Sequence, residues 1–110
     1  MSQKILIVDD EDYFRDLLEH SLEILADAGV ELLSATNGLD ALEIIKAEKP
    51  QLIFLDVMIP ELNGYDVCRT CKHELKLEDI YIIMMTTRGQ EFDKVTGLEV
   101  GADLYMRKPF

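Results

Sequence analysis

The sequence predicts an α/β fold in which a five-stranded parallel sheet is wrapped by helices on both faces. Three observations lead to this prediction. Short apolar runs rich in β-branched residues alternate with longer amphipathic stretches, Gly and Pro stand between them, and the first run lies only three residues after Met1. Strands that alternate with helices form parallel sheets, because each helix carries the chain back across the sheet.

The five apolar runs are short and nearly continuous, as expected for strands that are buried on both faces. Between them, apolar residues recur at helical spacing, for example Phe14, Leu17, Leu18, Leu22 and Leu25 in the first stretch. Gly29 ends that helix and Pro50 prevents extension of the next one. Strands are predicted at residues 5–8, 31–35, 52–55, 81–85 and 104–106, and helices at residues 12–28, 39–48, 65–75 and 90–100.

Length and charge narrow the class of protein. The chain has 110 residues, which is enough for one domain with a conventional core. It has 22 acidic and 11 basic residues, so its formal net charge is −11. This charge repels phosphate backbones and anionic lipid, so we expect no nucleic-acid or membrane partner for residues 1–110. No apolar segment fits a signal peptide or a membrane span, and a cytoplasmic location is predicted.

Polar residues follow four of the predicted strands. Asp9 and Asp10 follow the first strand, Asp56 the third, Thr86 the fourth and Lys108 the fifth. Ligands of such sheets bind beyond the carboxyl ends of the strands, so these side chains are expected to meet at one edge. A single acid after a strand is most simply explained as a helix cap or a solvated charge. This explanation does not account for polar residues at the ends of four strands.

The chemistry of the set favours phosphoryl transfer. Clustered carboxylates need a cation between them, and oxygen ligands at an open cleft favour Mg²⁺. A metal and a lysine neutralise phosphoryl oxygens, a hydroxyl binds a further oxygen, and a separate carboxylate serves as nucleophile.

The same motifs resemble those of the receiver domains of two-component response regulators, a family that includes chemotaxis regulators. The resemblance covers the whole chain and implies a flavodoxin-like, doubly wound fold with strand order 2-1-3-4-5. A fifth helix would normally follow, so we expect that the chain is truncated before that helix and that any effector domain lies outside it. The motifs are residues 5–11 (ILIVDDE), 52–60 (LIFLDVMIP) with 63–64 (NG), 82–86 (IIMMT) and 101–110 (GADLYMRKPF).

The resemblance assigns a role to each strand-end residue. Asp56 is the expected phosphoacceptor, attacking the phosphohistidine of a sensor histidine kinase or a histidine phosphotransfer protein. Mg²⁺ is expected to bind Asp10, Asp56 and the backbone carbonyl of Met58 directly, and Asp9 through a water molecule.

The remaining roles concern the phosphoryl group and the response to it. Thr86, Thr87 and Lys108 are expected to border or bind the phosphoryl group. Thr86 and Tyr105 form the expected switch, in which the ring turns inward as the hydroxyl moves toward the phosphate. The surface that responds comprises the predicted helix 90–100 and the fifth strand.

Two other functions fit the same fold. A Mg²⁺-dependent phosphohydrolase with an aspartyl-phosphate intermediate needs a further acid, and in a family of this kind another Asp lies two residues after the nucleophile, where this chain has Met58. A non-phosphorylated adaptor would tolerate a degraded acidic site, whereas this one is intact. We therefore expect a switch module rather than a turnover enzyme. Self-association through an uncovered sheet face, or through the responding surface, is a further expectation.

Cys68 and Cys71 form a C-x-x-C motif, which can be a redox pair or half of a zinc site. The motif lies on a predicted helix away from the strand ends, and no second pair exists in the sequence. The simpler interpretation is that the thiols pack into the core.

Thr87 departs from the family, which more often has a small residue there. We predict that Thr87→Ala changes the lifetime of the acyl phosphate more than it changes the stability of the fold. Phosphate release from the labelled protein and urea unfolding measure the two effects. Equal lifetimes for the two proteins would contradict the prediction.

Overall fold

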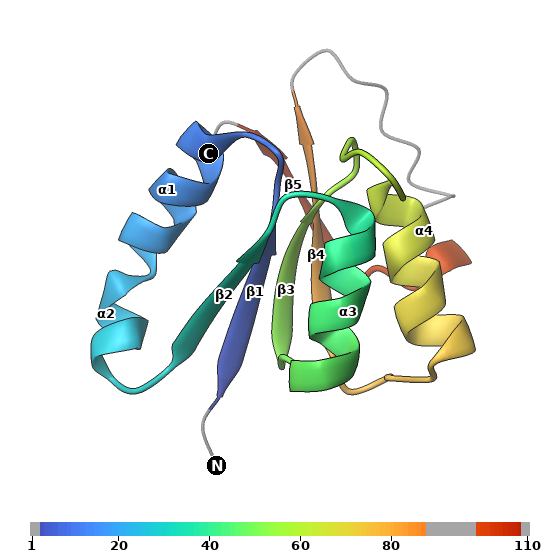
Figure 1. Cartoon of the computed structure of the whole chain (residues 1–110), viewed down its shortest axis with the longest axis horizontal. Helices are drawn as coiled ribbons and strands as arrows, with labels where there is room; N and C mark the ends of the chain where they lie inside the picture. Colours follow the sequence, from blue (N-terminus) through green and yellow to red (C-terminus); the bar gives the residue numbers. More distant parts are fainter. Residues whose placement is uncertain (1–2, 88–98, 109–110) are drawn as a thin grey trace.

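The computed structural model describes residues 3–87 and 99–108, and these residues contain one five-stranded parallel sheet. Its strand order is β2-β1-β3-β4-β5, as the resemblance implied. Figure 1 shows the sheet standing between α1 and α2 on one side and α3 and α4 on the other. The strands are β1 (Lys4–Val8), β2 (Glu31–Ala35), β3 (Leu52–Asp56), β4 (Tyr81–Thr87) and β5 (Leu104–Lys108).

The strands continue further than their apolar runs. Asp56 is the last residue of β3, and β4 and β5 end at Thr87 and Lys108, which are paired in register. Hydrogen bonding to the neighbouring strand therefore includes the polar residues that follow the apolar ones. This extension fixes the backbone of Asp56, Thr86, Thr87 and Lys108 within the sheet.

The buried apolar side chains form two clusters, one on each face of the sheet, because successive residues of a strand point to opposite faces. Leu6, Ile53 and Met84 belong to the cluster beneath α3 (Gly38–Glu48) and α4 (Gly64–Arg69). Ile7 and Met85 belong to the other, which includes Phe14 and Leu18 of α1 (Asp12–Ser21). Both faces of β1 and β3 are thus buried, which explains their uninterrupted apolar sequence.

The predicted helix 12–28 is two helices, α1 and α2 (Glu23–Asp27). Leu22 lies between them with φ −97° and ψ 6°, outside the helical values. The Ser21 hydroxyl donates to the carbonyl of Leu17 at 2.8 Å, and such bonds to the preceding turn weaken and bend helices. Gly29, at φ +97°, ends this segment as predicted.

The predicted helix 65–75 changes its pitch. It is α4 for its first turns and then the π-helical turn η1 (Thr70–Glu74), closed by the Leu75 amide donating to the Thr70 carbonyl at 2.8 Å. The helix predicted at 39–48 is confirmed as α3, whose Asn37 cap accepts from the Asp40 amide at 2.8 Å. Of the helix predicted at 90–100, residues 90–98 lie outside the described residues, while Glu99 and Val100 are helical.

The two cysteines lie in the core beneath α4 and η1. Both side chains are fully buried, and the Cys68 thiol donates to the carbonyl of Val100 at 3.4 Å. Burial raises the pKa of Cys68 to about 12 and that of Cys71 to about 11. The packing of both thiols agrees with the simpler interpretation of the C-x-x-C motif.

We predict that neither thiol reacts with Ellman's reagent at pH 8 while the protein is folded. Thiolate is the reactive form, and the raised pKa values reduce its fraction roughly 100-fold or more relative to the unfolded chain. Absorbance measured with and without denaturant checks this. Ser34→Cys, on the exposed side of β2, is the control and should react at once. Rapid reaction of Cys68 or Cys71 in the folded protein would contradict the prediction.

Candidate functional site

Three carboxylates surround one ammonium group at the carboxyl edge of the sheet. Lys108 Nζ lies 2.5 Å from Asp9 Oδ2, 3.1 Å from Asp56 Oδ2 and 3.2 Å from Glu11 Oε1. We call Asp9, Glu11 and Asp56 the acidic cluster. Lys108, Asp9 and Asp56 are almost fully buried, whereas Glu11 is about half exposed. The site therefore has one open side, next to Glu11.

Strand order brings these residues together. β1 and β4 both flank β3, and β5 pairs with β4, so the ends of β1, β3 and β5 face the same edge. Asp9 directly follows β1 and its amide donates to the carbonyl of Ala35 at 3.1 Å. Lys108 ends the edge strand β5 and reaches back to β1 and β3 along its four-carbon stem.

Asp56 is held by one backbone amide and one side-chain ammonium. Its Oδ1 accepts the amide of Met58 at 3.1 Å, while its Oδ2 accepts Lys108. Gly64, at the start of α4, approaches its backbone closely, since a Cβ there would lie 2.4 Å from the Asp56 carbonyl oxygen. The Gly64 amide also donates to the Val57 carbonyl at 2.8 Å, which closes the loop that follows β3. The Asp56 carboxylate is thus fixed relative to α4.

Asp9 and the loop that follows it are fixed in the same way. The Glu11 amide donates to Asp9 Oδ1 at 3.0 Å, and Arg15 Nη1 donates to the Asp9 carbonyl at 2.7 Å. Asp9 Oδ2 is fully buried and is ion-paired to Lys108, but it accepts no well-directed hydrogen bond within the described part of the chain. A buried carboxylate oxygen in this state has capacity for a further cationic partner.

The electrostatics of the site follow from burial and from the shared lysine. Burial raises the pKa of Asp56 to about 6. Lys108 opposes this shift, and the neighbouring Asp9 adds to it. Burial alone would lower the pKa of Lys108, but its close charge pairing with the carboxylates of Asp9 and Asp56 outweighs this effect and raises it. Lys108 is therefore charged at neutral pH, and one ammonium faces three carboxylates.

This arrangement fits a metal ion. The acidic cluster offers one oxygen from each residue, and these oxygens lie within 4.8 Å of one another. Oxygen ligands of this kind suit hard divalent cations. The excess of negative charge and the incompletely satisfied Asp9 Oδ2 also favour the binding of a cation.

The structure brings together three of the residues that the sequence predicted for the site. Asp9, Asp56 and Lys108 are in contact, and Thr86 is buried one residue before the end of β4. Asp10 is exposed and is not part of the acidic cluster, and Met58 is more than half exposed. The individual ligand roles of Asp9, Asp10 and the Met58 carbonyl stay predictions.

Thr86 and Tyr105 lie on the same face of the sheet. Tyr105 pairs with Met84 and Arg107 pairs with Thr86, so the ring and the hydroxyl are diagonal neighbours across β4 and β5. Tyr105 is partly buried against the cluster beneath α3 and α4. Thr87 pairs with Lys108 in the strand register.

Two residues of the site were missed by sequence reasoning. Glu11 has no predicted role beyond being the last residue of the motif 5–11, although its place in a run of four acids is a usable signal. Phe14 was predicted as an apolar residue of the first helix, and its ring centroid lies 4.3 Å from Lys108 Nζ. Nothing in the apolar periodicity distinguishes this contact from ordinary core packing.

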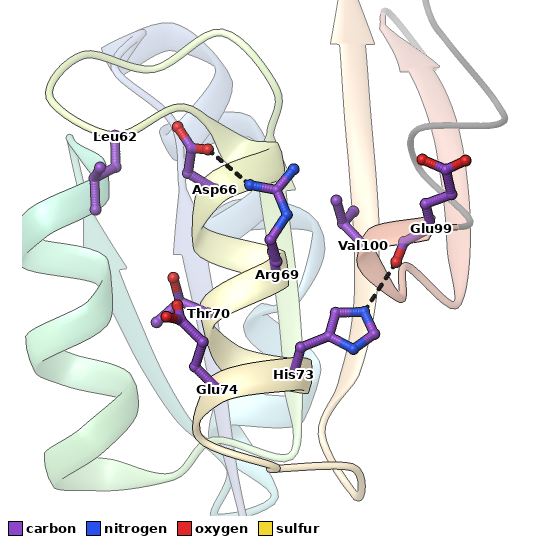
Figure 2. Close-up of a pocket in the computed structure, with 8 residues that line it drawn as sticks. All are labelled: Leu62, Asp66, Arg69, Thr70, His73, Glu74, Glu99 and Val100. Atoms are coloured by element: carbon purple, nitrogen blue, oxygen red, sulfur yellow. Dashed lines mark hydrogen bonds and ion pairs between the residues drawn. The ribbon is translucent and has the colours of Figure 1, made fainter.

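A separate hollow of about 720 Å³ lies between α4, η1 and the segment before β5, away from the acidic cluster (Figure 2). His73 Nε2 is 2.9 Å from the Glu99 carbonyl oxygen, and Arg69 pairs with Asp66 at 3.3 Å. The contact of His73 ties η1 to the residues that lead into β5. The hollow is lined by Leu62, Asp66, Arg69, Thr70, His73, Glu74, Glu99 and Val100.

Comparison with known proteins agrees with this fold and site. Residues 5–110 match the family model "Response regulator receiver domain". The alkaline phosphatase synthesis transcriptional regulatory protein PhoP of Bacillus subtilis is 46% identical over 110 residues, which are 100% of this chain and 44% of that protein. The chain belongs to the response regulator receiver domain family of two-component signalling, and it spans less than half the length of the curated relatives it matches.

Solved structures give the same result. The signal receiver domain of a DNA binding response regulator protein (merR) from Colwellia psychrerythraea superposes with a TM-score of 0.87 at 28% identity, covering 99% of this chain and 88% of that one. Vibrio cholerae chemotaxis protein CheY4 superposes with a TM-score of 0.84 at 30% identity, covering 100% of this chain and 89% of that one. No helix among the described residues is long and apolar enough to cross a membrane.

We predict that Asp56→Asn stabilises the protein at pH 7.5, and that this gain shrinks as the pH falls below 6. A carboxyl with a raised pKa in the folded state binds protons more tightly when folded, so stability is lost as pH rises from about 4 to 6. The substitution removes this loss, which is on the order of 2 kcal/mol.

Urea unfolding in EDTA at pH 4.5 and 7.5 measures the effect. Asp79→Asn makes the same change of side chain at an exposed residue of the loop before β4, outside the acidic cluster, and is the control for the change of net charge. A gain from Asp56→Asn that is constant, or that grows at low pH, would contradict the prediction.

Proposed function

We propose that this chain is a phosphorylation switch in which Asp56 accepts a phosphoryl group from the phosphohistidine of a partner protein. The partner is a sensor histidine kinase or a histidine phosphotransfer protein, as membership of the family implies. The observation that carries the proposal is the buried Asp56, paired to Lys108 beside two further carboxylates at the open edge of the sheet.

The transfer is a displacement at phosphorus. One carboxylate oxygen of Asp56 forms a bond to phosphorus as the bond from phosphorus to the histidine nitrogen breaks. The imidazole nitrogen keeps the electron pair of the broken bond. Asp56 must be ionised to attack, and with a pKa of about 6 it is largely ionised at neutral pH.

Charge neutralisation is the main requirement of the reaction, because the incoming group is anionic and the site already carries three carboxylates. Lys108 is positioned to pair with the phosphoryl oxygens, since it is already in contact with Asp56. A bound Mg²⁺ would supply the further positive charge. Asp10, Asp56 and the Met58 carbonyl would hold it, with Asp9 acting through water.

The response involves Thr86 and Tyr105. Because the two residues are diagonal neighbours on one sheet face, movement of the hydroxyl toward a phosphoryl oxygen changes the space available to the ring. Such a pair is a packing element with two arrangements, biased by a local charge. The proposed output is the surface of residues 90–100 and β5. In this proposal the domain acts in the cytoplasm and does not turn over substrate as an enzyme.

We predict that acetyl phosphate with Mg²⁺ labels the wild-type protein with one phosphoryl group, measured as a mass increase of the intact protein. Asp56→Asn should remain unlabelled, because an amide is not a nucleophile of this kind. Asp79→Asn has the same change of charge and should be labelled like the wild type. EDTA should abolish labelling.

The rival functions give different results in the same experiment. A phosphohydrolase would release phosphate repeatedly without accumulating a labelled protein. An adaptor with only the fold would neither accumulate label nor release phosphate. Either result for the wild type would overturn the proposal.

A further inference from the structure

Lys108 is held by an aromatic ring as well as by the acidic cluster. Its Nζ lies 4.3 Å from the centroid of the Phe14 ring, in addition to its three carboxylate partners. Both side chains are more than nine-tenths buried. The contact joins the first turn of α1 to the last residue of β5, which are far apart in the sequence.

The carboxylates do not fix the position of the ammonium group by themselves. Lys108 contacts all three acids, but its ammonium is a compact charge on a flexible four-carbon stem, so these contacts can exchange as the stem moves. An aromatic face attracts a cation at short range, and this attraction is larger when both groups are desolvated. The ring therefore stabilises one position of Nζ among the positions from which Nζ can contact the acidic cluster.

The Phe14 backbone is itself held in place. α1 begins at Asp12, directly after the loop in which Glu11 donates to Asp9 and Arg15 donates to the Asp9 carbonyl. The ring also packs in the apolar cluster that contains Leu18 and Met85. The ring is therefore anchored both to the strand that supplies Asp9 and to the core.

We propose that Phe14 is a positioning residue for the phosphoryl site, holding the Lys108 ammonium where it pairs with a group on Asp56. This inference rests on the proposed function and adds to it a residue of α1 that touches neither metal nor phosphoryl group. A ring takes no conventional hydrogen bond from the ammonium, so the N–H groups of Lys108 stay available to oxygen acceptors.

The test compares Phe14→Leu with Leu18→Val. Leucine keeps an apolar side chain at position 14 but removes the π face. Leu18 lies one turn later in α1 and belongs to the same apolar cluster, so Leu18→Val loosens the same core without removing the ring. Circular dichroism and urea unfolding establish that each variant is folded, and Phe14→Met replaces Phe14→Leu if leucine does not fold.

Two measurements are made on the folded variants. The affinity for beryllofluoride with saturating Mg²⁺, followed by ¹⁹F NMR, should fall roughly 2- to 30-fold in Phe14→Leu and remain near the wild-type value in Leu18→Val. The Cε proton signals of Lys108 should carry a ring-current shift in the wild type and in Leu18→Val, and should lose it in Phe14→Leu.

The outcomes separate the two proposals. If the wild type does not bind beryllofluoride, the proposed function fails. If the wild type binds, and folded Phe14→Leu binds equally well or more tightly, the positioning role fails while the proposed function stands. An equal loss of affinity in both variants would also overturn the positioning role, because it would reflect core packing alone.

Discussion

The buried ion cluster around Lys108 is the interaction on which the site depends. Removing charges from water is costly, and the cost is recovered only where partners are close and well oriented. Here one ammonium is shared by Asp9, Glu11 and Asp56, so the positive charge neutralises only part of the negative charge. This excess leaves the cluster with an affinity for a further cation, while burial is the main cause of the raised pKa of Asp56.

The sheet makes this cluster possible because it provides rigid ends at fixed spacing. Neighbouring strands lie about 5 Å apart, which places side chains on β1 and β3 within reach of a single lysine. The order β2-β1-β3-β4-β5 puts β3, the strand that ends at Asp56, in the middle of the sheet. Gly64 and the Met58 amide then fix the loop that follows it, so that Asp56 has little freedom of its own.

Much of this could be predicted from the sequence, since strand runs and the polar residues that end them are local patterns. Asp9, Asp56 and Lys108 were recognised because each follows an apolar run. The break at Leu22 and the π-helical turn at Thr70–Glu74 were not, because they depend on hydrogen bonds that leave the apolar periodicity unchanged. The contact of Phe14 with Lys108 was missed for another reason. It joins residues whose proximity only the tertiary fold determines.

The distance along the chain between the partners of the cluster has a consequence for biosynthesis. Lys108 follows Glu11 by 97 residues and Asp56 by 52. Until β5 has paired with β4, the carboxylates of β1 and β3 lack their common cation and repel one another. The site therefore assembles only when the last strand of the sheet is in place. A partially synthesised or partially folded chain has the Asp56 carboxylate without the ammonium group that neutralises it, so the complete ion cluster appears together with the finished sheet.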